Sequence, residues 1–72
     1  MRYVATVEKS GEWWIGWLPD LDGANAQERT LEELLQSLAA AATDLLSNQG
    51  IKDAKVEIEV QPEGAAGISI GV

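Results

Sequence analysis

A leucine-rich stretch from Thr30 to about Gln49, TLEELLQSLAAAATDLLSNQ, constrains the fold of this chain most strongly. Its apolar residues recur at the i, i+3, i+4, i+7 spacing of one helical face. They are Leu31, Leu34, Leu35, Leu38, Ala41, Ala42, Leu45 and Leu46. An isolated helix of this length is marginal in water, so the leucine stripe must be buried against another layer.

The sequence contains a start signal and a stop signal for this predicted helix. Thr30 can accept a hydrogen bond from a free backbone N–H of the first turn, and Glu33 can reach back to the Thr30 amide as a capping box. Glu32 and Glu33 place negative charge at the positive end of the helix dipole. Gly50 supplies the left-handed residue that ends the helix.

The layer that buries the stripe is expected to be a sheet made from the flanking residues. Alternating or β-rich patterns predict strands at residues 2–8, 13–18 and 54–60, and a polar turn at residues 9–12 joins the first two. Pro19 and the Asp22-Gly23 pair end the second strand. Residues 24–28, ANAQE, have poor strand propensity, and their composition predicts a loop.

The chain is expected to end with a turn and a short apolar tail. Residues 61–64, QPEG, are typical of a type I turn. The tail at residues 65–72 has Ile68, Ile70 and Val72 at period two. It can return as an edge strand beside residues 54–60, pair with another subunit, or fray.

Tryptophan is expected on both faces of the predicted hairpin. An even-numbered loop puts one set of residues on one face: Tyr3, Ala5, Val7, Trp14, Gly16 and Leu18. The other face then carries Val4, Thr6, Trp13, Ile15 and Trp17. One helix covers one face of the sheet. On the second face, the tryptophan side chains either lie flat under neighbouring side chains, or form a surface for self-association or for a foreign partner.

Length and composition predict one small domain, residues 1–72, that gains stability by oligomerising. A core of this size rarely supplies more than ~3–5 kcal/mol, and the absence of cysteine excludes disulfides. Twelve acidic and five basic residues give a net charge of −7, which argues against direct DNA or RNA binding and suits solubility or a basic partner. The longest apolar run is too short to span a membrane, so we expect a cytoplasmic protein.

No catalytic arrangement stands out, and we expect neither an enzyme nor a cofactor. Histidine and cysteine are absent, so the serines lack a base, and the glycines at 64 and 67 are followed by no lysine or helix. Asp20 and Asp22, with Glu8, are the one candidate carboxylate site for a hard cation such as Mg²⁺. Aspartate in a Pro/Gly turn more often binds its own backbone, so no metal site is predicted.

The order of several short motifs resembles the N-terminal domain of HicB-like antitoxins of bacterial type II toxin–antitoxin systems. Tyr3, Ala5, Val7, Glu8 and Trp14 match the first two strands of that family. More specific are PDLDG at residues 19–23 and, seven residues later, TLEEL at residues 30–34. The resemblance covers about residues 2–60, while the C-terminal DNA-binding segment that family members usually carry is not seen.

The resemblance implies a fold and a function. The fold is α+β in the order β-β-β-α-β, partly reduced ribonuclease H-like: a three-stranded antiparallel sheet, a long helix on one face and a fourth strand. It makes residues 23–28 a strand despite their composition, and places residues 54–60 parallel to the first strand. The implied function is to bind and neutralise a small basic RNA-cleaving toxin, without nuclease activity.

Two functional hypotheses follow. In the first, an antitoxin-like module binds its partner through Trp13 and Trp17 as apolar anchors, with Asp20 and Asp22 as charges at the rim. In the second, the chain is an orphan homo-oligomer, a dimer or tetramer with a structural or regulatory role and no toxin partner.

Overall fold

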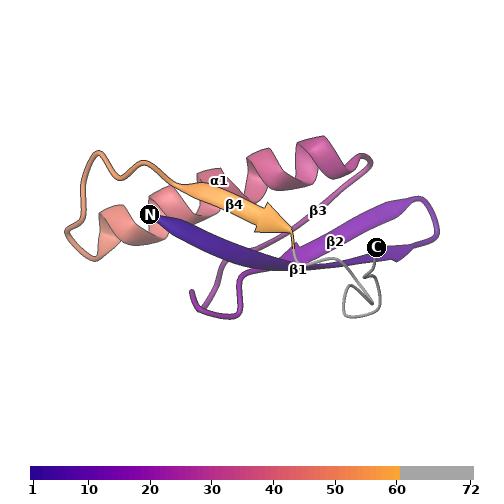
Figure 1. Ribbon diagram of the computed structural model, residues 1–72, viewed down its shortest axis with the longest axis horizontal. Helices are drawn as coiled ribbons and strands as arrows, with labels where there is room; N and C mark the ends of the chain where they lie inside the picture. Colours follow the sequence, from indigo (N-terminus) through magenta and orange to yellow (C-terminus); the bar gives the residue numbers. More distant parts are fainter. Residues whose placement is uncertain (61–72) are drawn as a thin grey trace, which may run out of the picture.

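One helix lies across one face of a mixed four-stranded sheet in the computed structural model, which describes residues 1–60 (Figure 1). Along the chain the elements are β1 (Arg2–Ser10), β2 (Trp13–Trp17), β3 (Asn25–Glu28), α1 (Leu31–Asn48) and β4 (Glu57–Val60). The strand order is β3-β2-β1-β4. The first three strands are antiparallel neighbours, and β4 runs parallel to β1. The sheet is therefore mixed and four-stranded, and not a three-stranded antiparallel sheet, while β4 lies parallel to β1 as expected.

The β1–β2 hairpin closes through a two-residue turn, Gly11-Glu12, which is shorter than the predicted turn at residues 9–12. Gly11 has φ of +61°, and a two-residue hairpin turn favours glycine at such a position. The register places Val7 opposite Gly16 and Thr6 opposite Trp17. Because side chains alternate along a strand, this register confirms the two sets of residues predicted to share a face.

The helix covers the face that carries Gly16, and this glycine lets it approach closely. A Cβ atom added to Gly16 would lie 3.0 Å from Leu34 Cδ2 and 3.2 Å from Leu38 Cδ1. Both leucines are fully buried. The apolar core comprises Ala5, Leu18, Leu21, Ala24, Leu34, Leu38, Ala42 and Leu46. A Cβ atom at this position would press on both leucines, so glycine lets these side chains of α1 lie directly above β2.

Local capping fixes both ends of α1. The Glu33 N–H donates to Thr30 Oγ1 at 3.1 Å, and the Thr30 hydroxyl in turn donates to Glu33 Oε1 at 3.1 Å. The Glu33 carboxylate thus accepts from the hydroxyl, where we expected it to accept from the Thr30 amide. At the other end Gly50 has φ of +92°, and the Ile51 N–H donates to Leu46 O at 2.8 Å. This six-to-one bond is the signature of a Schellman motif.

The loop predicted from composition at residues 24–28 is wrong, because Asn25–Glu28 forms strand β3. The preceding loop folds back on itself, and the Leu18 N–H donates to Ala24 O at 3.0 Å. This bond brings residue 25 opposite Trp17 and Ala26 opposite Gly16. Ala26 is small enough to fit under α1, so tertiary pairing overrides the poor intrinsic propensity of this segment.

Strand β4 is aligned by the first residue of the chain. The Met1 amino group donates to Lys55 O at 2.6 Å, and the Glu57 N–H donates to Met1 O at 2.8 Å. Regular strand geometry begins at Glu57, later than the predicted start at residue 54. The turn predicted at residues 61–64 and the tail at residues 65–72 lie outside the described residues.

We predict that Gly16→Val destabilises the fold by roughly 1–3 kcal/mol, because the added methyl groups overlap Leu34 and Leu38. Chemical unfolding followed by circular dichroism measures this change. Gln27→Val places the same side chain on the opposite face of the sheet and should be close to neutral. Equal stability of the two variants would show that α1 does not lie over Gly16.

We predict that Thr30→Ala lowers the free energy of unfolding by about 1 kcal/mol, because it leaves the Glu33 N–H without its cap. The matched control is Thr43→Ala in the middle of the helix. The Thr43 hydroxyl donates to Ala39 O, a carbonyl already inside the helix, so its removal should be neutral or slightly stabilising. A control variant as unstable as Thr30→Ala would contradict the capping role.

Candidate functional site

The face of the sheet opposite α1, called the open face below, has no covering element among residues 1–60 (Figure 1). Strand alternation assigns its side chains, because the cross-strand partners share a face. From β1 and β2 it carries Arg2, Val4, Thr6, Glu8, Trp13, Ile15 and Trp17. From β3 and β4 it carries Asn25, Gln27, Glu57 and Glu59. It is the largest surface of the sheet that the described residues leave to solvent.

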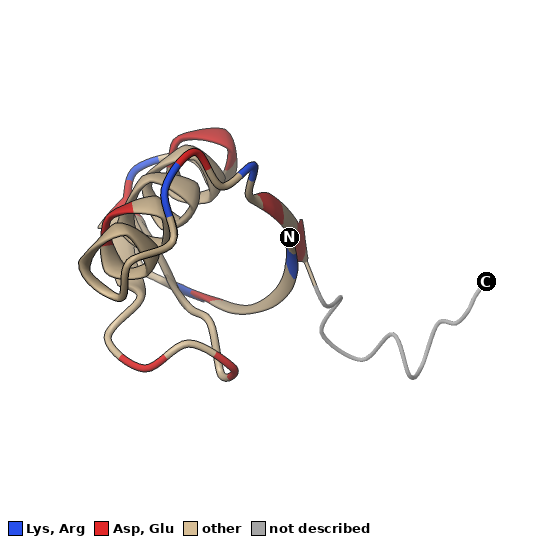
Figure 2. Cartoon of the chain, turned by 90° about the vertical axis from the view of Figure 1, so that its left-hand side faces the viewer, with Lys and Arg blue, Asp and Glu red and all other residues tan. Residues whose placement is uncertain are grey.

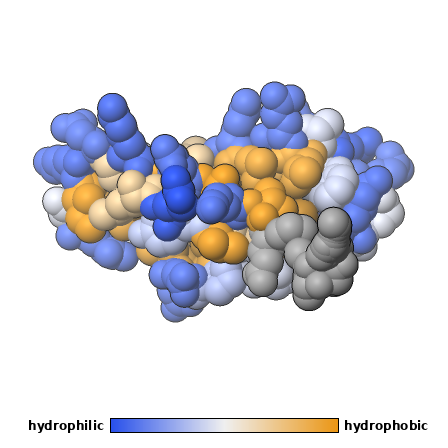
Figure 3. Space-filling model, viewed as in Figure 1, coloured by the Kyte–Doolittle hydropathy of each residue, from blue (hydrophilic) through white to orange (hydrophobic). Residues whose placement is uncertain are grey.

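An apolar strip runs along β2 on the open face. Trp13 is 38% exposed, while Ile15 and Trp17 are half-buried by neighbouring side chains. Val4 on β1 is 41% exposed. The predicted binding tryptophans, Trp13 and Trp17, therefore do lie on one face, two residues either side of Ile15. Figure 3 shows apolar surface interrupted by polar residues on the side of the molecule that it displays.

Trp13 is held by an arginine that sequence reasoning missed. The Arg29 guanidinium lies 4.7 Å from the centre of the Trp13 ring, and Arg29 Nη1 lies 3.2 Å from Glu12 Oε1. Residue 29 connects β3 to α1, so this contact joins the hairpin turn to the start of the helix. The stacked guanidinium fixes the ring through a cation–π contact worth about 0.5–1 kcal/mol at an exposed site.

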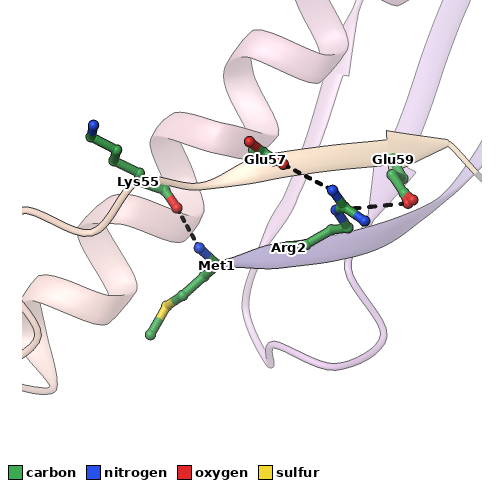
Figure 4. Close-up of polar contacts among 5 residues, drawn as sticks. All are labelled: Met1, Arg2, Lys55, Glu57 and Glu59. Atoms are coloured by element: carbon green, nitrogen blue, oxygen red, sulfur yellow. Dashed lines mark hydrogen bonds and ion pairs between the residues drawn. The ribbon is translucent and has the colours of Figure 1, made fainter.

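Carboxylates outnumber cations on the open face. Arg2 Nη2 lies 3.4 Å from Glu57 Oε1, and Arg2 Nε lies 4.0 Å from Glu59 Oε2 (Figure 4). These pairs are solvent-exposed, so each contributes little to stability. Glu8 lies opposite Ile15 in the β1–β2 ladder and adds a third carboxylate beside the apolar strip. The open face is thus apolar at β2 and acidic around it.

The other two predicted binding residues, Asp20 and Asp22, are exposed in the loop that follows Trp17. Leu21 between them is buried and anchors the loop, and the Leu21 N–H donates to Leu18 O at 3.0 Å. This alternation turns both carboxylates outward. Figure 2 shows the loop with its acidic residues projecting from the body of the domain. They lie beyond the end of β2, in a loop that packs against α1 through Leu21 and Gly23.

The metal site considered for Asp20, Asp22 and Glu8 gains no support from the geometry. Residues 1–60 contain no group of three carboxylate, histidine or cysteine side chains that could hold a metal ion. Glu8 lies in the β1–β2 ladder, whereas both aspartates belong to the loop after β2.

The described part of the chain also has no helix long and apolar enough to cross a membrane.

A second contact that was not predicted from the sequence, between Lys9 and Trp14, lies near the hairpin turn. Lys9 is paired with Trp14, and its Nζ atom lies 5.4 Å from the centre of the Trp14 ring. Val7, Glu8, Lys9 and Trp14 line a shallow, open depression of about 400 Å³. Lys9 covers the one tryptophan on the helix side of the sheet, so Trp14 contributes to packing rather than to the open face.

No protein-family model, curated protein or solved structure matches this chain. The likeness to HicB-like antitoxins consequently rests on the motifs in the sequence.

We predict that Arg29→Ala increases solvent access to Trp13, because the stacked guanidinium no longer covers the ring. Acrylamide quenching measures this access in a background where Trp14→Phe and Trp17→Phe leave Trp13 as the one fluorophore. Lys52→Ala, which removes an exposed cation outside the sheet, serves as the control. Unchanged quenching after Arg29→Ala would contradict the stacked arrangement.

Proposed function

We propose that this chain is an antitoxin-like protein-binding module that neutralises a small basic RNA-cleaving toxin by docking it on the open face. The observation that carries the proposal is the face of the sheet that residues 1–60 leave uncovered, where Trp13, Ile15 and Trp17 form an apolar strip beside carboxylates. An aromatic strip with an acidic border suits a protein surface that is both apolar and basic.

The apolar strip supplies the affinity in this proposal. Tryptophan is enriched among residues whose truncation costs more than about 2 kcal/mol of binding free energy. Trp13 and Trp17 are held in place by β2, so little conformational entropy is lost when a partner covers them. Arg29 already stacks on Trp13, and a partner therefore meets a ring of fixed orientation.

In this proposal the acidic charge favours basic partners over other proteins and raises the rate of association. The net charge of −7 attracts a basic protein and repels nucleic acid phosphates, so direct DNA or RNA binding is not part of the proposal. Asp20 and Asp22 are exposed in the loop that follows β2, where solvent screens them. Charges at such a position mainly raise the association rate and its dependence on salt.

The fold and the motifs support the same proposal. The element order β-β-β-α-β is compatible with a partly reduced ribonuclease H-like domain of the HicB-like type. The two most specific motifs have structural roles: residues 19–23 form the loop anchored by Leu21, and Thr30 caps α1. A module of this type would act in the cytoplasm, where its toxin cleaves RNA.

An orphan homo-oligomer is the second candidate. It is favoured by the small core, in which only Leu34 and Leu38 are large, fully buried side chains among the residues described. Such a core gains stability by associating with further copies. In that case the open face would have no foreign partner.

We predict that Trp13→Ala and Trp17→Ala each weaken binding of a small basic protein encoded beside this chain by at least tenfold, roughly the loss expected for an aromatic anchor. Isothermal titration calorimetry with the purified partner measures the dissociation constant. Gln36→Ala, on the exposed side of α1, is the control and should leave the constant unchanged. Full affinity in both tryptophan variants, with their folds intact, would contradict docking on the open face.

A further inference from the structure

We propose that two copies of this chain associate edge to edge, by antiparallel pairing of residues 54–60 of one copy with the same residues of the other. The pairing would continue the sheet across a two-fold axis that passes between the two Glu57 residues. This surface is the outer backbone edge of β4 and of the three residues before it, and it does not involve the apolar strip on β2, so the inference does not rest on the proposed function.

The outer edge of β4 presents backbone groups to a new strand. Within residues 1–60, the strand order ends at β4. The Glu57 N–H and the Lys55 carbonyl both bond to Met1, so odd-numbered residues direct these groups toward β1. Backbone groups alternate along a strand, and those of residues 56, 58 and 60 consequently point outward. An unpaired edge of this kind is a template for another strand.

The side chains of this segment form two distinct rows. On the helix side Ala54, Val56, Ile58 and Val60 are all half-buried. On the opposite side Lys55, Glu57 and Glu59 are exposed. A second copy paired antiparallel would place Val56 opposite Ile58 on the helix side, once on each side of the central Glu57 pair. The apolar layer beneath α1 would then run on from one copy to the other and lose its exposed border.

Charge decides the direction of pairing. Antiparallel pairing about Glu57 places Lys55 of each copy opposite Glu59 of the other, giving two attractive cross-strand pairs. Parallel pairing in register would place lysine against lysine and glutamate against glutamate. The central Glu57 residues oppose each other, but each has its own Arg2 guanidinium at 3.4 Å. The arrangement is self-complementary, as a two-fold dimer requires.

The open face is a poorer surface for self-association. Stacking two copies face to face would set two faces that each carry Glu8, Glu57 and Glu59 against one another. Of the cations on this side, Arg2 is already paired with Glu57, Arg29 is paired with Glu12, and Lys55 lies before the start of β4. Pairing through β4 avoids this repulsion. A seven-residue ladder buries less than the ~1,200 Å² of a standard interface, so we expect a weak, concentration-dependent dimer.

Sedimentation equilibrium of the full chain tests the proposal through a charge exchange. Lys55→Glu and Glu59→Lys each turn both attractive pairs into repulsive ones, and each should weaken dimerisation by roughly tenfold. An equimolar mixture of the two variants restores both attractive pairs and should form a heterodimer more readily than either variant pairs with itself. Lys52→Glu makes the same charge change outside the ladder and should dimerise like the original chain.

Three outcomes would overturn the proposal. A chain that stays monomeric up to about millimolar concentration would mean that the edge has another occupant, including residues 61–72 of the same chain. Single variants that dimerise normally, with no preference for the mixed pair, would exclude this register. A dimer abolished by Trp17→Ala, yet insensitive to both charge changes, would assign self-association to the open face.

Discussion

The packing of α1 on Gly16 determines which surface this protein offers to others. Two fully buried leucines lie over that glycine, and a Cβ atom added there would lie 3.0 Å and 3.2 Å from their methyl carbons, closer than an ordinary van der Waals contact. Every other residue of β2 has a side chain, so the helix has one place where it can approach the sheet so closely. Once the helix is seated there, strand alternation sends Trp13, Ile15 and Trp17 to the opposite face. The open face is thus a consequence of core packing.

Elements with local signals could be predicted from the sequence. The helix was predicted to within a residue at each end, because its leucine period, the Thr30 cap and Gly50 all act within one or two turns. The two residue sets of the hairpin were predicted for the same reason. Which set the helix covers could not be predicted, since it depends on contacts between residues 16 and 34 that no local pattern records. Strand β3 was expected from the resemblance but not from its own composition, because its pairing with β2 and the bond from the Leu18 N–H to Ala24 O align it.

The candidate site was predictable in outline only. Alternation along β2 was enough to place Trp13 and Trp17 together, and a Pro/Gly turn was enough to expose Asp20 and Asp22. The Arg29–Trp13 stack could not be foreseen, because it joins residues 16 positions apart through the fold of β3. The outward direction of the backbone groups of alternate β4 residues could not be foreseen either. It follows from the hydrogen bonds of Met1 to Lys55 and Glu57, which form only in the folded sheet. Two surfaces follow from this geometry: a face suited to a basic partner and an edge suited to a second copy.

A nuclear Overhauser spectrum of the isotopically labelled chain tests the central claim most directly. If α1 covers the Gly16 face, the methyl groups of Leu34 and Leu38 give cross-peaks to the Gly16 Hα protons. The same methyl groups give none to the indole rings of Trp13 and Trp17. Cross-peaks from these leucines to either indole ring would place the helix on the other face, and the account of the binding surface would then be wrong.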